Sequence, residues 1–173
     1  MFFYTGIGSR ETPLEFLELM TLIAKYLAEK EIVLRSGGAK GADSYFEIGC
    51  DLSNGKKEIY LPWREFNNNS SLLYPPSNEC LEMAKKYHPA WDRLSQGAQK
   101  LQSRNCNQIL GKDLKTPSHF VLCWTKNGSG GGGTGQAIRI AKDYNVPVFD
   151  MGKYDLENCQ IELNKFLDEL KFI

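Results

Sequence analysis

The sequence has no surplus of charge of either sign. Its 173 residues include 21 Lys and Arg against 21 Asp and Glu, and the pI is about 6.7. A protein whose main task is to coat nucleic acid usually carries a basic surplus, because neutralising phosphates supplies much of its affinity. The balanced composition argues against that task for the chain as a whole and leaves only a local basic stripe open.

The sequence also lacks any cluster of cysteine or histidine. None of the five cysteines forms a C-x-x-C pair, and the two histidines do not have the spacing of metal ligands. This pattern is typical of reduced, buried thiols in a cytosolic protein, and it predicts no disulfide framework, no metal site and no cofactor. The residues concerned are Cys50, Cys80, Cys106, Cys123, Cys159, His88 and His119.

Long hydrophobic runs are absent as well. No run approaches the roughly 18 apolar residues that a membrane span needs. Residues 1–6 have neither the basic start nor the long apolar stretch of a signal peptide. We therefore expect a soluble, cytoplasmic protein without a membrane partner. A chain of this length can bury one good core, so residues 1–173 are expected to form a single domain.

The sequence is organised around two glycine-rich turns, one at residues 35–43 and one at residues 127–136. Each follows a short apolar run and precedes a segment with helical periodicity. Glycine lets a ligand approach the main chain closely, and the helix that starts next adds unpaired N–H donors and the positive end of its dipole. Two such turns in one small domain predict a ligand that carries phosphate.

Short apolar segments alternate with helix-like segments along the chain, which predicts an α/β fold. We expect a three-layer Rossmann-like domain with a mainly parallel sheet of about five strands. A loop and helices at about 62–112 interrupt the alternation as an insertion, and its first part, 62–76, is typical of a binding lid or a disordered loop. The expected strands are residues 2–7, 32–34, 57–61, 120–124 and 146–149, and the expected helices are residues 14–27, with Thr12 as its cap, 43–52, 78–87, 94–110, 135–144 and 156–170.

The glycine turns and one further turn should share a crevice. In open parallel sheets, ligands bind outside the carboxyl ends of the strands, where the strand order reverses. Gly8, Ser9 and Arg10 follow the first expected strand, and the two glycine-rich turns follow the second and fourth. All three segments therefore belong to the same edge of the sheet.

Four motifs in a fixed order resemble the SLOG superfamily of Rossmann-like nucleotide-binding proteins, which includes DprA, the LOG nucleotide phosphoribohydrolases and the YspA-like proteins. They are residues 6–10, 36–43, 103–105 and 131–135, and the resemblance extends over about residues 3–149. It implies a nucleotide-binding domain that forms homo-oligomers. The compact form is similar to small stand-alone members, many of them encoded by phages, so a phage origin is implied by that likeness alone.

One position departs from the LOG pattern. LOG hydrolases carry a glutamate soon after the second glycine turn, whereas this chain has Gln136. Glutamine can neither act as a carboxylate base nor stabilise an oxocarbenium ion by charge. An enzyme that cleaves nucleotide N-glycosidic bonds would therefore need another carboxylate, and Asp43 and Glu47, one helical turn apart, are the candidates for catalytic residues.

We accordingly expect the protein to bind a nucleotide or a nucleotide-derived small molecule. The alternatives are a LOG-like nucleotide N-glycosidase and, third because of the neutral composition, a DprA-like protein that binds single-stranded DNA. Trp63, Trp91, Trp124 and Tyr74 are candidate base-stacking residues, but packing is their simpler interpretation. The expected binding residues are Gly8, Ser9, Arg10, Ser36, Gly37, Gly38, Asp43, Arg104, Asn105, Gly131, Gly132, Gly133 and Thr134, with the phosphate on the last four beside Arg10 and Arg104, and the sugar near Ser36, Asp43 and Asn105.

Overall fold

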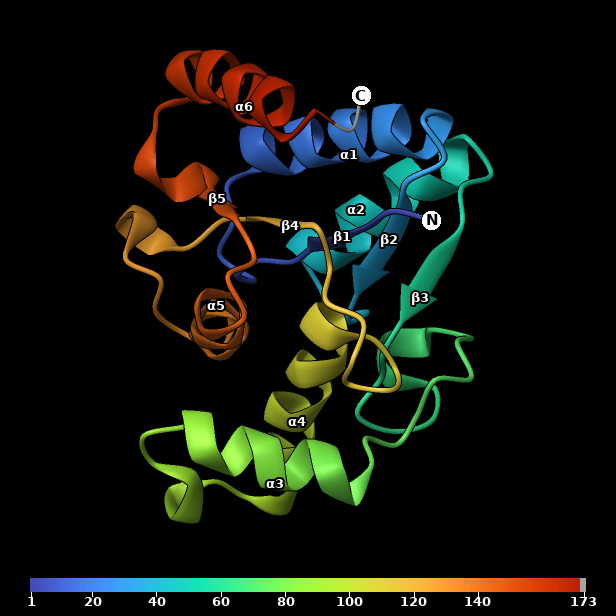
Figure 1. The fold of residues 1–173 in the computed structure, drawn as a ribbon, viewed down its shortest axis with the longest axis vertical. Helices are drawn as coiled ribbons and strands as arrows, with labels where there is room; N and C mark the ends of the chain where they lie inside the picture. Colours follow the sequence, from blue (N-terminus) through green and yellow to red (C-terminus); the bar gives the residue numbers. More distant parts are fainter. Residues whose placement is uncertain (172–173) are drawn as a thin grey trace.

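The computed structural model describes residues 1–171 and contains a five-stranded parallel sheet (Figure 1). Each neighbouring pair of strands is parallel, and the strand order is β3-β2-β1-β4-β5. The order therefore reverses between β1 and β4, and the expected Rossmann-like α/β fold is confirmed. The strands are β1 (Phe3–Gly6), β2 (Val33–Ser36), β3 (Lys57–Ile59), β4 (Phe120–Cys123) and β5 (Val148–Asp150).

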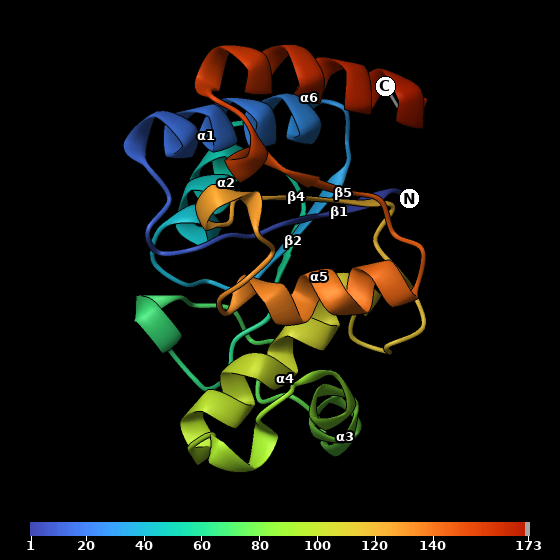
Figure 2. The same ribbon diagram turned by 90° about the vertical axis from the view of Figure 1, so that its left-hand side faces the viewer.

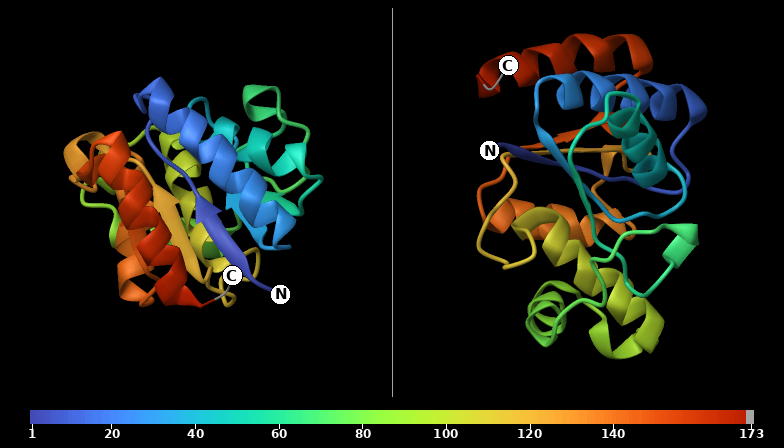
Figure 3. Two further views of the ribbon diagram at one scale, coloured as in Figure 1. Left: turned by 90° about the horizontal axis from the view of Figure 1, so that it is seen from above. Right: turned by 90° about the vertical axis from the view of Figure 1, so that its right-hand side faces the viewer.

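Helices cover both faces of the sheet. Three of them, α1 (Leu14–Glu29), α2 (Ala42–Leu52) and α6 (Leu156–Leu170), lie on one face, with α1 between α6 and α2 (Figures 1 and 3). On the other face lie α4 (Gln96–Leu110) and α5 (Thr134–Asp143), and α3 (Asn78–Tyr87) packs outside them (Figure 2). The sheet is thus shielded on both sides, as parallel sheets usually are.

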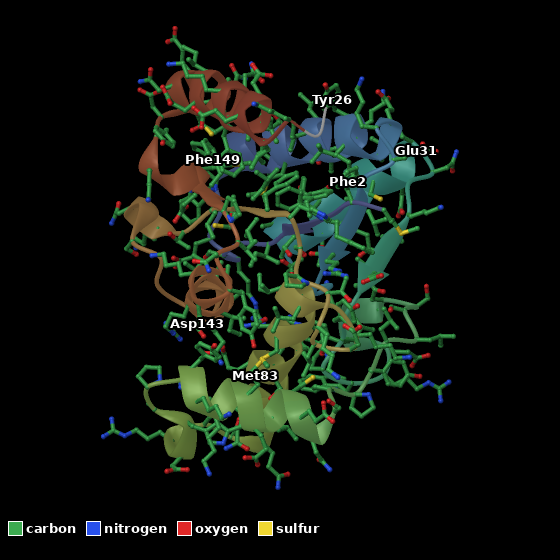
Figure 4. The ribbon with its side chains drawn as sticks, in the orientation of Figure 1. Phe2, Tyr26, Glu31, Met83, Asp143 and Phe149 are labelled. Carbon is green, nitrogen blue, oxygen red and sulfur yellow. The ribbon has the colours of Figure 1, made fainter. Side chains whose placement is uncertain are left out.

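Two separate hydrophobic clusters result from the alternation of side chains along the strands. Phe120 and Leu122 of β4 point into the cluster under α1, α2 and α6, whereas Val121 and Cys123 point into the cluster against α4 and α5. Phe149 of β5 lies under α6 (Figure 4), with its ring centroid 5.3 Å from that of Phe166. The sheet is therefore packed against apolar side chains on both faces at β4, which explains why this strand is a continuous apolar run.

The ends of the helices test three expectations. Ser77 caps α3 as expected, because its hydroxyl accepts a hydrogen bond from the backbone N–H of Cys80 at 3.2 Å, and Gly111 ends α4 with φ 78°. The expected cap at Thr12 was wrong. Pro13 occupies the N-cap position, and the Thr12 hydroxyl instead donates to the carbonyl oxygen of Ser9 at 2.6 Å. Thr12 lies one residue too early and closes the preceding turn.

The segment expected as an insertion contains the helix that the topology needs. Because β3 is an edge strand and β4 lies beyond β1, the chain must cross the sheet between them, and α4 is on this crossover. The loop before it packs on the first glycine turn: Asn67 donates to the carbonyl oxygen of Gly38 at 3.0 Å, and Asn69 donates to Glu47 Oε1 at 2.8 Å. The division into one domain with an insertion stays a prediction, and residues 172 and 173 lie outside the described part.

Three further observations concern the features that the sequence lacks. Between residues 1 and 171, no helix is long and apolar enough to cross a membrane. Over the same range, no three His, Cys, Asp or Glu side chains are grouped so that they could hold a metal ion. All five cysteines are free and buried, so they contribute to packing as the sequence predicts.

Candidate functional site

A cavity of about 530 Å³ lies at the switch point of the sheet, where β1 and β4 end. Its walls come from the turn after β1, from α2 and α4, and from the turn that leads into α5. This is the position at which open α/β sheets bind ligands. The lining residues are Ile7, Gly8, Ser9, Arg10, Glu11, Ala39, Asp43, Leu101, Gln102, Arg104, Asn105, Gln108, Lys126, Ser129, Gly131, Gly132, Gly133 and Thr134.

The outer end of this cavity is formed by the glycine turn and the N-terminus of α5. Among residues 1–171, no acceptor takes a hydrogen bond from the backbone N–H of Gly132 or Gly133. Thr134 begins the helix, so the positive end of its dipole faces the same space. Arg10 and Lys126 are exposed and line the cavity here. The outer end therefore combines unpaired amides with two cations, which is the chemistry of an anion site.

A hydrogen-bonded chain from β5 holds the start of this glycine turn. Asp150 accepts hydrogen bonds from the backbone N–H groups of Thr125 and Gly152, each at 2.9 Å, and from the Thr125 hydroxyl. With its proton committed to Asp150, the Thr125 oxygen accepts from the N–H of Gly130 at 2.9 Å. The turn is thus anchored to the sheet at one end and to α5 at the other.

Arg104 and Asn105 connect α4 to the same turn. The Asn105 amide donates to the carbonyl oxygen of Gly133 at 3.2 Å, and its own oxygen accepts from Arg104 Nη1 at 2.6 Å. Arg104 Nη1 also donates to the carbonyl oxygen of Leu101 at 3.1 Å, but Nε is buried and has no partner among residues 1–171. Burial lowers the pKa of Arg104, while the charge of Asp43 opposes that change. Arg104 therefore borders the cavity as a buried guanidinium whose Nε lacks an acceptor among residues 1–171.

Asp43 is the buried carboxyl of the site. It lies in the first turn of α2, is only 4% exposed, and accepts a hydrogen bond from the backbone N–H of Ala39 at 3.2 Å. Burial raises the pKa of Asp43 to about 6, and Glu47 adds to this rise, whereas Arg104 and the N–H groups of Ala39 and Gly37 oppose it. Both protonation states are therefore accessible near neutral pH, as in groups that transfer protons.

The cavity brings together most of the residues that the sequence singles out. They come from four segments far apart in the chain, and each segment follows a strand or, for α4, crosses from one to the next. The cavity therefore lies where the crevice is expected, and its role in binding stays a prediction. The members found in its lining are Gly8, Ser9, Arg10, Asp43, Arg104, Asn105, Gly131, Gly132, Gly133 and Thr134.

Four expected residues do not line the cavity. The Ser36 hydroxyl donates to the carbonyl oxygen of Gly6 on the neighbouring strand at 2.6 Å, so it is used inside the sheet. Gly37 packs against the side chains of Arg104 and Gln108, and Gly38 packs against Leu61 and Asn69. Glu47 forms an ion pair with Lys57 Nζ at 2.8 Å and accepts from Asn69. These partners come from distant parts of the chain and are not visible in the local pattern.

Sequence reasoning missed several polar residues of the lining. Lys126 lies three residues after the end of β4, in the run that leads into the glycine turn, and this position could have identified it. Gln108 lies one helical turn after Arg104, so the same helix face carries both. Among the 18 lining residues none is aromatic, and the candidate stacking residues pack elsewhere: the ring centroids of Trp63 and Phe66 lie 5.4 Å apart.

Comparisons with known proteins give a likeness in structure but not in sequence. No protein-family model and no curated protein matches the chain. DprA from Helicobacter pylori, described with a single-stranded DNA binding mode, has a TM-score of 0.54 and 15% identity, with 97% of this chain and 81% of that chain covered. DprA from Streptococcus pneumoniae has a TM-score of 0.54 and 18% identity, with 95% and 56% covered. The molybdenum cofactor carrier protein MCP from Chlamydomonas reinhardtii has a TM-score of 0.43 and 13% identity, with 96% and 98% covered.

The fold and the cavity together define a Rossmann-like α/β protein with a ligand crevice at its switch point. More particularly, the chain has the Rossmann-like fold of the DprA proteins, which belong to the SLOG superfamily that its four motifs resemble. At these identities the likeness concerns the fold. The chain spans little more than half of the length of the Streptococcus pneumoniae protein.

Proposed function

We propose that the cavity binds a nucleotide or a nucleotide-derived small molecule, with a phosphate on the residues from Gly131 to Thr134. The observation that carries this proposal is the buried Nε of Arg104, which has no acceptor among residues 1–171. A buried donor without a partner is rare in folded proteins and costs about 1–3 kcal/mol. A bound ligand with acceptor oxygens would supply what the protein itself does not.

The charges and the size of the cavity support the same proposal. Arg10, Arg104 and Lys126 bring three positive charges, against two negative charges from Glu11 and Asp43. The protein is neutral overall, so this excess is local. A volume of about 530 Å³ falls within the range of roughly 300–1,000 Å³ typical of small-molecule sites. An anionic ligand of nucleotide size fits both properties.

The test uses the two exposed cations, whose removal leaves the buried core intact. Arg10→Gln combined with Lys126→Gln should weaken the binding of nucleoside monophosphates at least about tenfold, because both lost charges face the proposed phosphate. Lys85→Gln combined with Arg93→Gln is the matched control, since it removes two exposed charges outside the cavity lining. Isothermal titration calorimetry measures the nucleotide affinity of wild type and of both double variants. Equal affinities of wild type and the cavity variant would show that the phosphate does not bind there.

A second candidate function is hydrolysis of a nucleotide N-glycosidic bond, which the position of Asp43 favours. Its carboxyl borders the cavity and its pKa is raised to about 6, so it could protonate a leaving base near neutral pH. Glu47 is held by Lys57 and is the weaker of the two catalytic candidates. Incubation with nucleotides followed by chromatography should then show free base, with release abolished by Asp43→Asn. Intact nucleotides after prolonged incubation would exclude this activity.

A third candidate is the binding of single-stranded DNA, which the Helicobacter pylori relative with the same fold favours. Arg10 and Lys126 lie at the exposed end of the cavity and could contact a backbone phosphate. This function predicts that an oligonucleotide binds far better than a mononucleotide, and that its affinity falls steeply with salt. Fluorescence anisotropy at two salt concentrations tests it. An oligonucleotide that binds no better than a mononucleotide leaves the small ligand as the better proposal.

A further inference from the structure

Asp43 is a buried carboxyl in the wall of the cavity that no ion pair neutralises. Its side chain lines the cavity, although the residue is almost entirely shielded from solvent. Within residues 1–171 it forms no ion pair, and its hydrogen bonds come from the backbone N–H groups of Ala39, at 3.2 Å, and Gly37. A buried carboxylate loses hydration that two amides only partly replace. Its protonation state therefore depends on which charges enter the cavity.

Charged groups from each neighbouring element act on Asp43. On α2 itself, Glu47 adds a like charge one turn later, but Lys57 pairs with Glu47 at 2.8 Å. Burial of Asp43 is the largest cause of the rise of its pKa to about 6, and the charge of Arg104 on α4 only partly opposes it. In the free protein Asp43 is therefore mostly ionised at pH 7. The remaining charged residues of the lining are exposed and are Arg10, Glu11 and Lys126.

An anion in the cavity disfavours the ionised form of Asp43. At about 10 Å, the width of a round cavity of this volume, and at an effective dielectric constant of about 20, two negative charges repel enough to change a protonation equilibrium about tenfold. The cations of the lining attract the anion, but they do so in both protonation states of Asp43. A protonated carboxyl can also donate a hydrogen bond to an oxygen of the anion, whereas a carboxylate only accepts. Both effects favour protonation when the anion is bound.

We infer that the cavity takes up a proton together with its anion, and that Asp43 is the group that holds this proton. The inference rests on the proposed function, because it needs an anion in this cavity. The proton comes from the solvent and binds a carboxylate oxygen of Asp43, and no covalent bond to the ligand forms. Anion binding is then regulated by pH, with the highest affinity in mildly acidic solution.

The sign and size of this pH dependence follow from the linkage between protonation and binding. Below about pH 6, Asp43 carries its proton with and without the anion, so its titration does not affect the affinity. Above pH 6 the free protein loses the proton and must regain it on binding, so the affinity falls with rising pH. A tenfold effect on the protonation equilibrium predicts a fall in affinity of about tenfold between pH 5 and pH 8.

The first test uses inorganic sulfate and the wild-type protein. Sulfate keeps two negative charges over this whole pH range, so only the protonation of the protein changes. Isothermal titration calorimetry at constant ionic strength should show sulfate binding at least about tenfold more weakly at pH 8 than at pH 5. At pH 7, titrations in two buffers with different ionisation enthalpies should show the uptake of at least about 0.4 proton for each sulfate bound.

Two variants assign the proton to Asp43. Asp43→Asn keeps the shape of the side chain but cannot change its charge, so its affinity for sulfate should no longer fall between pH 5 and pH 8. AMP is the second probe: its phosphate titrates near pH 6 with either protein, so the ratio of the two affinities isolates Asp43. Glu11→Gln is the matched control, because it removes an exposed carboxylate from the same lining and should keep the wild-type pH dependence.

The outcomes separate this inference from the function on which it rests. Sulfate binding of equal strength at pH 5 and pH 8 would overturn the inference and leave the proposed anion site standing. A pH dependence that persists in Asp43→Asn, or that disappears in Glu11→Gln, would assign the proton to another group and overturn it as well. Failure of both sulfate and AMP to bind wild type at any pH would overturn the proposed function itself. Because the pH profile and the proton uptake are measured on wild type, a misfolded Asp43→Asn variant would not remove the test.

Discussion

Replacing Asp43 by asparagine should change the stability of the free protein in a pH-dependent way. Asp43 is 4% exposed, and burial is the largest cause of the rise of its pKa from 3.8 to about 6. Asparagine has the same shape and can still accept a hydrogen bond from the N–H of Ala39, but it has no proton to lose. The variant therefore isolates the free energy of placing an ionised carboxylate at this position.

The sign and size follow from the linkage between protonation and folding. Because the folded-state pKa is raised, protonation of Asp43 stabilises the fold fully below the unfolded-state pKa of about 4, and this stabilisation is lost as the pH rises through about 6. At ~1.4 kcal/mol per pKa unit, the complete difference is ~3 kcal/mol. The Asp43→Asn variant should thus gain about 2–3 kcal/mol in free energy of unfolding, relative to wild type, between pH 4 and pH 8.

Urea denaturation followed by tryptophan fluorescence measures this difference at pH 4, 6 and 8. Asp92→Asn serves as the control, because Asp92 is exposed on the surface of the short 3-10 helix Trp91–Arg93 and no comparable change is expected there. A difference between Asp43→Asn and wild type that is constant across this range would refute the reasoning. It would mean that the ionised carboxylate of Asp43 is fully compensated in the folded protein.

Two other substitutions test the geometry around the site and the start of α3. Gly37→Ala would place a Cβ 2.0 Å from Gln108 Nε2, so it should lower the free energy of unfolding by about 1–3 kcal/mol, whereas Gly133→Ala, with φ −61° and no neighbour closer than 3.9 Å, should leave stability nearly unchanged. Equal effects in urea denaturation would contradict this geometry. Ser77→Ala removes the hydroxyl that caps α3 and should cost about 1 kcal/mol in the same assay, with Ser77→Asp restoring most of the loss.

Much of the fold could be predicted because its strands and helices have strong local signals. The run at residues 120–123 is apolar on both faces and stands between polar turns, which is typical of a central parallel strand. Where a local signal was ambiguous, the prediction failed at the boundary. Val146 is apolar like a strand residue, but its N–H donates to the carbonyl oxygen of Ala141 at 2.8 Å, so it belongs to the turn after α5 and β5 begins at Val148.

The candidate site could be predicted only as far as chain order determines it. Segments that follow parallel strands meet at one edge, and this rule alone joins Arg10, Asp43 and Thr134. This rule does not predict which side chains form ion pairs or hydrogen bonds with another helix or strand instead of lining the cavity. Glu47 shares a helix face with Asp43, yet the ion pair with Lys57 from β3 holds it. Gln108 is the opposite case, since the sequence pattern does not single it out and yet it lines the cavity. Its position depends on how closely α4 approaches the first glycine turn.

The close packing of α4 against the first glycine turn lowers the free energy of unfolding of the ligand-free protein. Packing α4 against Gly37 buries Arg104 and Gln108, and within residues 1–171 Arg104 Nε has no acceptor and the side-chain amide of Gln108 makes no hydrogen bond. Apolar side chains there would avoid that penalty. A ligand that satisfies these groups binds only the folded state, so it should raise the stability in proportion to RT ln(1 + [L]/Kd). Under the proposed function, the groups that lower the stability of the free protein are therefore the ones that should supply affinity for the ligand.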